Sequence, residues 1–197
     1  MKKYIPFIII IVVVVLSFIL PTTEVTTVTG VHLDTGDTAW LLASAALVLL
    51  MTPGLAFFYG GMVHKKNVIS TMLQSFVCMG LVTIVWIVFG EDIGGIIGNP
   101  TTFYMMKGTL GNNSWPGMPT IPLVLFAMFQ LKFAVLTPAL ITGGFAERIK
   151  FNAYLIFLTL FVILIYAPLA HSTWHPDGKK KKMGVSRIFL LFFGRRQ

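Results

Sequence analysis

The chain has 197 residues, of which 56% are hydrophobic and only 11% are charged, and its mean hydropathy is +0.84. A soluble domain of this length does not cover so much apolar surface with so few charged side chains, so the composition indicates a membrane protein. The formal net charge of +8 comes from cations clustered at the ends of apolar runs, which favours membrane topology over nucleic-acid binding. The single cysteine, Cys78, excludes a disulfide framework and a thiolate metal site.

The first 21 residues combine a basic start with a short apolar block. Lys2 and Lys3 precede an apolar run over residues 5–20, and Pro21 closes it. A secretory signal peptide has this shape, but no clean pair of small residues marks a cleavage site. The segment is therefore either a signal peptide or an uncleaved N-terminal anchor. Residues 22–36, rich in Thr and Gly, are expected to form an external segment.

Two long apolar segments follow, and each is long enough to span a membrane as a helix. The first runs from about Thr38 to Gly61, with Asp37 or Thr38 expected to cap its first turn. Pro53-Gly54 is predicted to interrupt this helix, which membrane helices tolerate where neighbours satisfy the freed carbonyl. The second segment runs from about Val68 to Phe89.

A polar region separates these segments from two further apolar ones. Residues 90–119 are rich in Gly, Asn and Pro and predict an irregular loop. A third span is predicted from about Ile121 to Gly144 and a fourth from about Phe151 to Ala170. The tight turn between them contains Glu147 and Arg148, which we expect to pair locally.

The distribution of cations predicts the orientation of the spans. Loops 64–67 and 147–150 carry the basic clusters and are predicted to be cytoplasmic, whereas the acidic loop 90–119 is predicted to be external. His64 is expected to be solvated in its loop. Lys132 lies towards the outer third of its span, where we expect its ammonium group to reach the interface.

Small and polar residues within the spans favour a multi-helix channel or transporter over a simple anchor. Glycines, glutamines, prolines and threonines punctuate the first and third spans. The alternative of an intramembrane enzyme requires paired carboxylates or a Ser/His pair on facing helices. The spans contain no Asp or Glu, and His171 and Ser172 are merely adjacent in sequence. We therefore expect no enzyme, no catalytic residue, no metal ligand and no cofactor.

Three blocks of sequence carry a specific resemblance. They are Pro53–Val63 followed by Lys66-Asn67; Phe129–Ala134 leading into Thr137–Gly143 and Phe145–Arg148; and Tyr166–His171 with Trp174 just beyond. In order and spacing these blocks resemble the Amt/Mep/Rh ammonium transporters over roughly residues 36–185. The resemblance implies an all-α, polytopic membrane helix bundle that contains the first four core helices of the ammonium-transporter fold.

Phe129 and Phe133 are four residues apart and therefore lie on one face of the third span. Aromatic faces attract a cation through their quadrupoles while it sheds water. The resemblance implies that Phe133 and Trp174 bind ammonium at an external recruitment site, and that Phe129 belongs to an aromatic gate below it. It also implies ammonium or ammonia as the substrate, a multi-pass location in the plasma membrane, a homotrimer in the full-length protein, and a PII-type cytoplasmic regulator.

The sequence departs from the family pattern near its C-terminal end. Family members continue with a second, inverted half that completes the pore, and neither of the two expected pore histidines is present. Lys179–Lys182 precede Met183-Gly184-Val185, after which residues 186–197 no longer fit the family. We interpret residues 37–185 as a partial transporter domain and 186–197 as an aberrant tail produced by a frameshift. Two functional hypotheses follow, namely a channel for ammonium or ammonia and a nonfunctional fragment of such a channel.

Overall fold

The computed structural model describes residues 32–90 and 117–174, together with Val12, Val15, Met106, Thr109, Ser114 and Trp115. The α-helices are α2 (Thr35–Met62), α3 (Val68–Val85), α4 (Leu123–Ile141), α5 (Phe151–Phe161) and α6 (Ala167–Trp174). Short 3₁₀ helices are η1 (Lys65–Asn67) and η4 (Thr142–Phe145), and π-helical segments are η2 (Trp86–Gly90) and η5 (Val162–Tyr166). Two short strands, β1 (Ser114–Trp115) and β2 (Met118–Pro122), complete the described elements.

Four helical segments in the described ranges are long and apolar enough to cross a membrane. They are Thr35–Met62, Lys65–Val88, Leu123–Phe145 and Phe151–Ala170. The prediction of four core spans is therefore confirmed, and the chain is a multi-pass membrane protein. The predicted N-terminal signal or anchor segment, apart from Val12 and Val15, and the predicted tail 186–197 lie outside the described residues.

The first turn of α2 differs from the prediction that Asp37 or Thr38 would cap it. The helix begins at Thr35, and its N-cap is Asp34, whose Oδ1 accepts a hydrogen bond from the Asp37 amide at 2.8 Å. The hydroxyl of Thr38 instead donates to the Asp34 carbonyl at 2.7 Å. The capping prediction was wrong because Asp34 supplies the same side-chain chemistry one turn earlier, before the apolar run begins.

Pro53 does not interrupt α2, contrary to the prediction. The helix is continuous from Thr35 to Met62 with Pro53 inside it. Thr52, which precedes the proline, and Ala56, three residues after it, are both buried. Packing on both sides of the proline thus keeps the helical path, although a proline in a free helix removes a hydrogen bond and favours a kink.

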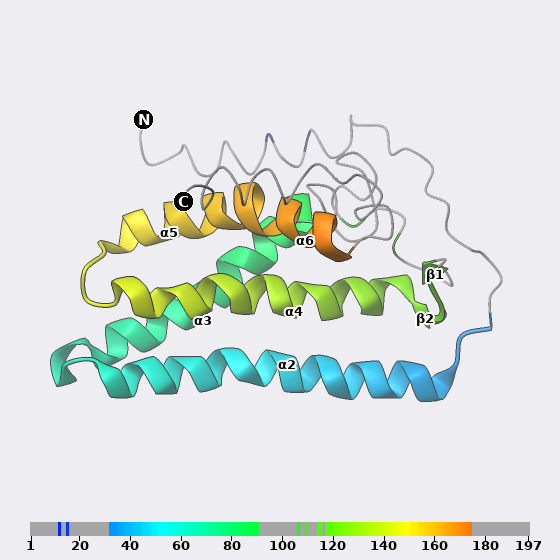
Figure 1. The fold of residues 1–197 in the computed structure, drawn as a ribbon, viewed down its shortest axis with the longest axis horizontal. Helices are drawn as coiled ribbons and strands as arrows, with labels where there is room; N and C mark the ends of the chain where they lie inside the picture. The colour runs from blue at the N-terminus through cyan, green and yellow to red at the C-terminus, as the bar shows by residue number, and fades with distance from the viewer. Residues whose placement is uncertain are drawn as a thin grey trace, which may run out of the picture.

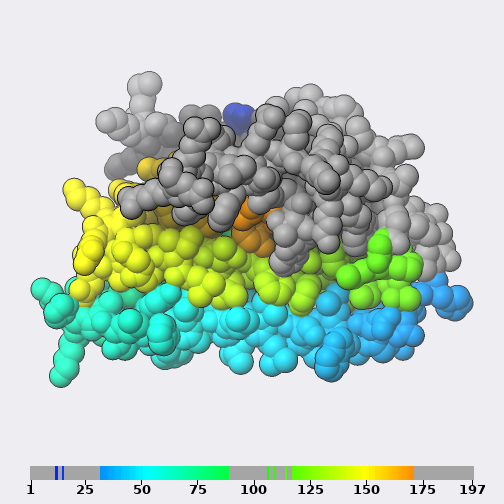
Figure 2. Space-filling model, in the orientation of Figure 1, coloured from blue at the N-terminus to red at the C-terminus, as the bar shows by residue number. Residues whose placement is uncertain are grey.

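The helices form one bundle in which α2 and α4 lie side by side and run in the same direction (Figure 1). The helix α3 crosses behind them and contacts both, and α5 packs on α3. In the space-filling view α2 forms one long edge of the molecule, with α4 directly above it (Figure 2). The core is formed mainly by side chains of α3, α4 and α5: Cys78, Val82, Val85, Trp86, Leu131, Ala134, Val135, Ala139, Tyr154, Leu158 and Val162.

A small antiparallel hairpin ends the polar region that the sequence predicted as an irregular loop. Ser114 pairs with Pro122 and Trp115 with Met118, with an irregularity in register between them. The third span was predicted to start at about Ile121, but Ile121 belongs to β2 and α4 begins at Leu123. Pro122 cannot donate an interior helical hydrogen bond, which explains why the helix starts after it.

The hairpin fastens the start of α2 to the start of α4. The amide of Asp34 donates to the carbonyl of Thr120 at 2.9 Å, and the Thr120 hydroxyl donates to Asp37 Oδ2 at 2.7 Å. These two contacts join residues that are more than 80 positions apart in the chain. We refer to this end of the bundle as the hairpin end, and to the opposite end as the turn end.

Candidate functional site: an aromatic pair and a clasped turn

The two aromatic residues predicted on one face of the third span do lie together. The ring centroids of Phe129 and Phe133 are 5.2 Å apart, and the rings are inclined at 78° in an edge-to-face arrangement. Both residues are half-buried, so part of each remains accessible. The carbonyl of Phe133 accepts a hydrogen bond from the Thr137 hydroxyl at 2.8 Å, one turn along α4. The pair is therefore a preformed aromatic surface near the middle of α4.

The second predicted ligand, Trp174, is the last residue of α6. The side chains of residues 171–174 lie outside the described part of the structure, and so do the pocket walls that they would form. The predicted approach of Trp174 to Phe133 therefore stays a prediction. Lys132, which was expected to extend towards the interface, is half-buried on α4 beside Phe133.

Two glutamines are buried inside the bundle with a side-chain oxygen that has no hydrogen-bond partner among the described residues. Gln130 follows Phe129 directly and is 7% exposed, and Gln74 on α3 is 6% exposed. A buried glutamine such as Gln74 is a candidate for an interhelical hydrogen bond. Its main chain has that role, because its carbonyl accepts a bond from the Tyr154 hydroxyl at 2.9 Å.

Tyr154 is a polar connection between three helices that the sequence analysis missed. Its fully buried hydroxyl reaches Gln74 on α3 and lies 3.4 Å from the hydroxyl of Thr142, at the end of α4. A buried hydroxyl needs partners because leaving it unpaired in an apolar interior is costly. The only signal in the sequence was a tyrosine among aliphatic residues at the start of the fourth span.

At the turn end, a carboxylate joins the two turns that connect the helices. Glu147 accepts hydrogen bonds from the His64 amide at 2.8 Å and from Asn67 Nδ2 at 2.9 Å. The His64 Nδ1 atom lies 3.0 Å from Glu147 Oε2. We refer to these three residues as the clasp. The prediction that Glu147 would pair with Arg148 was wrong, because the bundle brings the two turns within hydrogen-bonding distance. His64 is exposed in its loop as predicted, with its side chain 79% accessible, and it also contacts Glu147.

The backbone and the acidity of Glu147 both reflect this arrangement. Its φ of 65° places it in the left-handed region, which non-glycine residues adopt only where surrounding contacts hold them. Hydrogen bonds from Asn67, then from the side chain and amide of His64, lower the pKa of Glu147 from 4.5 to about 2. The carboxylate is therefore ionised throughout the physiological range.

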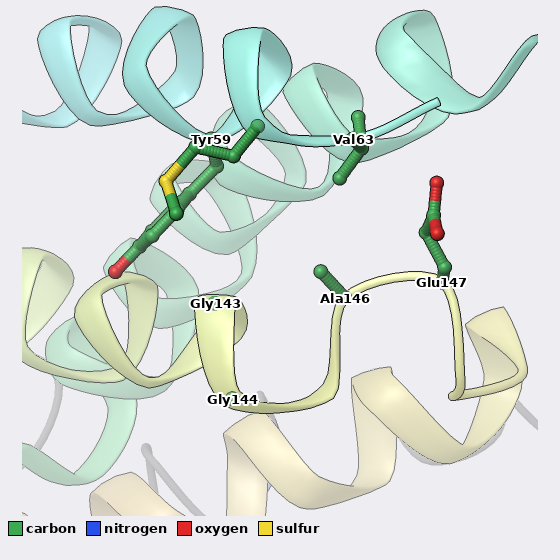
Figure 3. Close-up of a pocket in the computed structure, with 7 residues that line it drawn as sticks. Tyr59, Val63, Gly143, Gly144, Ala146 and Glu147 are labelled. Atoms are coloured by element: carbon green, nitrogen blue, oxygen red, sulfur yellow. The ribbon is translucent and has the colours of Figure 1, made fainter. Parts of the chain in front are cut away.

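A pocket of about 360 Å³ opens beside the clasp (Figure 3). Its walls come from the end of α2, from η4 and from the turn after it: Tyr59, Met62, Val63, Gly143, Gly144, Ala146 and Glu147. The Tyr59 hydroxyl donates to the carbonyl of Leu140 at 2.6 Å and fixes α2 against the end of α4. The described residues contain no group of three or more His, Cys, Asp or Glu arranged to hold a metal ion.

Comparison with known proteins identifies the family. The profile of the Ammonium Transporter Family matches residues 39–188, which is most of the chain. The chain belongs to the ammonium transporter family. That family consists of transporters, so the assignment also confirms the prediction that the chain is not an enzyme.

Several curated relatives are close in sequence to this family member. It is 46% identical over 164 residues to an ammonium transporter of Mycobacterium tuberculosis (strain ATCC 25618 / H37Rv), a match that covers 74% of this chain and 34% of the relative. It is 45% identical over 150 residues to the ammonium transporter of Bacillus subtilis (strain 168), covering 71% of this chain and 35% of the relative. The chain thus spans about a third of the length of the curated relatives it matches.

The fold also matches solved structures of this family. The chain superposes on Saccharomyces cerevisiae Mep2 with a TM-score of 0.65 and 27% identity, covering 75% of this chain and 34% of Mep2. Candida albicans Mep2 gives the same TM-score of 0.65 with 26% identity, covering 75% of this chain and 33% of that protein. The predicted all-α, polytopic ammonium-transporter fold is therefore confirmed for the four spans.

Proposed function

We propose that these residues form the N-terminal part of a channel-like transporter that moves ammonium or ammonia across the plasma membrane. The observation that carries the proposal is the family match over residues 39–188, together with four spans in the arrangement of the Mep2 fold. The composition supports the same function, because the described spans contain small and polar residues that a lipid anchor does not need. Transport by this sequence is the hypothesis to be tested.

Within this function, Phe133 and Trp174 are assigned to an external ammonium recruitment site and Phe129 to the aromatic gate below it. The geometry of the Phe129–Phe133 pair supports the assignment, because two half-buried rings 5.2 Å apart present quadrupoles to a dehydrating cation. The side-chain oxygen of Gln130, which has no hydrogen-bond partner among the described residues, adds a buried acceptor at the position that follows Phe129. The recruitment site also requires the side chain of Trp174 to approach Phe133.

The orientation follows from the basic turns. Lys65, Lys66, Arg148 and Lys150 all lie at the turn end, which the positive-inside rule assigns to the cytoplasm. The hairpin end and the region 90–119 are then external, on the side where Phe129 and Phe133 would meet incoming ammonium. The assembly into a homotrimer and the regulation by a PII-type protein are proposed for the full-length protein from its family alone.

A second candidate is that the sequence as it stands inserts and folds without conducting. The observation that favours it is the coverage, because the chain matches only about a third of the M. tuberculosis and B. subtilis transporters. Neither pore histidine of the family pattern is present, so no residue of this chain is assigned to the deprotonation and conduction step.

Uptake of radiolabelled methylammonium into proteoliposomes separates the two candidates. One set of vesicles contains this chain, and the other contains a fusion of residues 1–185 to the remaining two thirds of the B. subtilis transporter. Saturable uptake by both preparations indicates a conducting chain, whereas uptake by the fusion alone indicates an inserting fragment. Absence of uptake from a folded fusion, with uptake by the intact B. subtilis protein as the positive control, contradicts the proposed function of this sequence.

A further inference from the structure

The helix α4 has one face turned into the bundle and an opposite face that the described residues leave partly open. Leu131 and Ala134 lie on the inner face and are almost completely buried. Phe129, Lys132 and Phe133 are all half-buried. Because positions i, i+3 and i+4 share one side of a helix, the aromatic pair and this lysine lie together on the open face.

Lys132 is a cation without a counter-ion in the part of the chain that the structure describes, where its side chain has neither an ion pair nor a hydrogen bond. The acidic residues among those described, Asp34, Asp37 and Glu147, lie at the two ends of the bundle and accept hydrogen bonds there from other groups. A charge inside a membrane span is costly, and such residues usually face a bundle interior or a water-filled cavity. An uncompensated positive charge therefore stands beside the aromatic pair.

We propose that Lys132 determines the charge selectivity of the aromatic pair. Its ammonium group opposes the binding of a monovalent cation at Phe129 and Phe133, and so favours the neutral amine over the protonated one on this face. The proposal rests on the proposed function, because it requires the open face of α4 to meet the permeant. The Cα–Cβ bonds of a helix tilt towards its N-terminus, so the Lys132 side chain starts out towards the hairpin end, from which ammonium would arrive.

The repulsion by Lys132 is comparable in size to the attraction by the rings. Two like unit charges about 10 Å apart weaken binding about 4- to 20-fold when the effective dielectric constant is about 40 to 20. A cation–π contact strengthens the binding of a cation by a similar factor. The lysine thus offsets much of the aromatic attraction for the protonated amine, whereas the neutral amine has no net charge for it to repel.

The first experiment measures binding of methylammonium to the full chain in a neutral detergent, by saturation-transfer NMR of the methyl group. Lys132→Gln should bind methylammonium about 4- to 20-fold more tightly than the wild type. Lys132→Arg keeps the charge and should retain the wild-type affinity. Lys150→Gln removes a cation at the turn end and is the matched control, with no expected change. Adding Phe133→Leu to Lys132→Gln should remove most of the gain, which locates the binding at the aromatic pair.

A second experiment uses the fusion of residues 1–185 to the B. subtilis transporter. Lys132→Gln should lower the KM for methylammonium by the same factor and raise the charge moved per molecule taken up, measured as current on a supported membrane. A fusion that folds without uptake contradicts the proposed function, and the binding measurement then decides the role of Lys132 by itself.

Equal affinities of the wild type and Lys132→Gln, including no detectable binding by either, would overturn the role of Lys132. An equal gain from Lys132→Gln and Lys132→Arg would also overturn it, because a purely structural effect does not follow the charge. Helicity by circular dichroism checks that each variant folds. Lys132→Met replaces Lys132→Gln if the latter does not fold, with the same expected gain.

Discussion

At the scale of single residues, the side chains with the clearest geometry are the aromatic pair on α4 and the carboxylate of the clasp. The four-residue spacing was enough to predict that Phe129 and Phe133 would meet, because helical periodicity is a local property. The partner of Glu147 was not predictable in this way. His64 and Asn67 lie 83 and 80 residues away in the chain, and only the packing of the bundle brings them to the carboxylate.

Replacing Phe133 tests the proposed recruitment site. In a transport-competent fusion, Phe133→Leu should raise the KM for methylammonium by about 2- to 30-fold, because a cation–π contact contributes roughly 0.5–2 kcal/mol. Uptake kinetics in proteoliposomes provide the measurement. Phe161→Leu, an aromatic replacement on α5 away from the pair, should leave the KM unchanged, and equal effects of the two substitutions would contradict a specific role for Phe133.

The acidity of Glu147 predicts how the clasp responds to pH. Because its pKa is lowered from 4.5 to about 2, its ionised form stabilises the fold above pH 4.5, and this contribution is lost as the pH falls from about 4.5 towards 2. The Tm of the wild-type chain should therefore exceed that of Glu147→Gln at pH 7, and the difference should shrink below about pH 4.5. A difference in Tm that is the same at pH 7 and pH 3 would contradict the clasp.

At the scale of helices, the sequence predicted which segments are spans, but it missed how they begin and how they touch. Long apolar runs are recognisable because each must cross the hydrocarbon core. The start of α2 at Thr35, the start of α4 after Pro122 and the unbroken path through Pro53 depend on caps and neighbours outside the runs themselves. The contact of Tyr59 with the end of α4 likewise depends on a neighbouring helix and was not predicted from the apolar runs.

The close approach of α2 to η4 requires a glycine at position 143. A Cβ atom there would lie 2.5 Å from Tyr59 Cε1 and 2.8 Å from Cζ, whereas a Cβ at Gly144 would meet nothing within 4 Å. Gly143→Ala should therefore lower the free energy of unfolding by about 1–3 kcal/mol, as overpacking does elsewhere. Gly144→Ala is the matched control and should be nearly neutral. Denaturation in detergent provides the comparison, and equal stability of the two variants would refute the close contact.

At the scale of the whole molecule, the two ends of the bundle differ in chemistry. The hairpin end contains Asp34, Asp37 and Thr120, and the turn end contains the four cations around the clasp. Composition and cation clusters predicted this polarity from the sequence. The predicted approach of Trp174 to Phe133 involves a side chain outside the described residues and stays a prediction.

Opposite exposure of the two ends is open to direct measurement. Lys65→Cys should react with a membrane-impermeant maleimide only from the cytoplasmic side, and Met118→Cys, which replaces a residue that is 40% exposed, only from the external side. Cys78 is fully buried, so background labelling of the native chain should be low. Labelling of both substitutions from one side of the membrane would contradict the proposed topology.

The hairpin's contacts with α2 have a consequence for the order in which the protein assembles during synthesis. The first turn of α2 leaves the ribosome more than 80 residues before Thr120, which supplies its carbonyl and hydroxyl to Asp34 and Asp37. The clasp likewise waits for Glu147 before it can join the turn at His64. These hydrogen bonds at the two ends of α2 therefore cannot form until the later residues have been made. Those at the hairpin end become possible first, and those of the clasp second, as the third span and the turn behind it emerge.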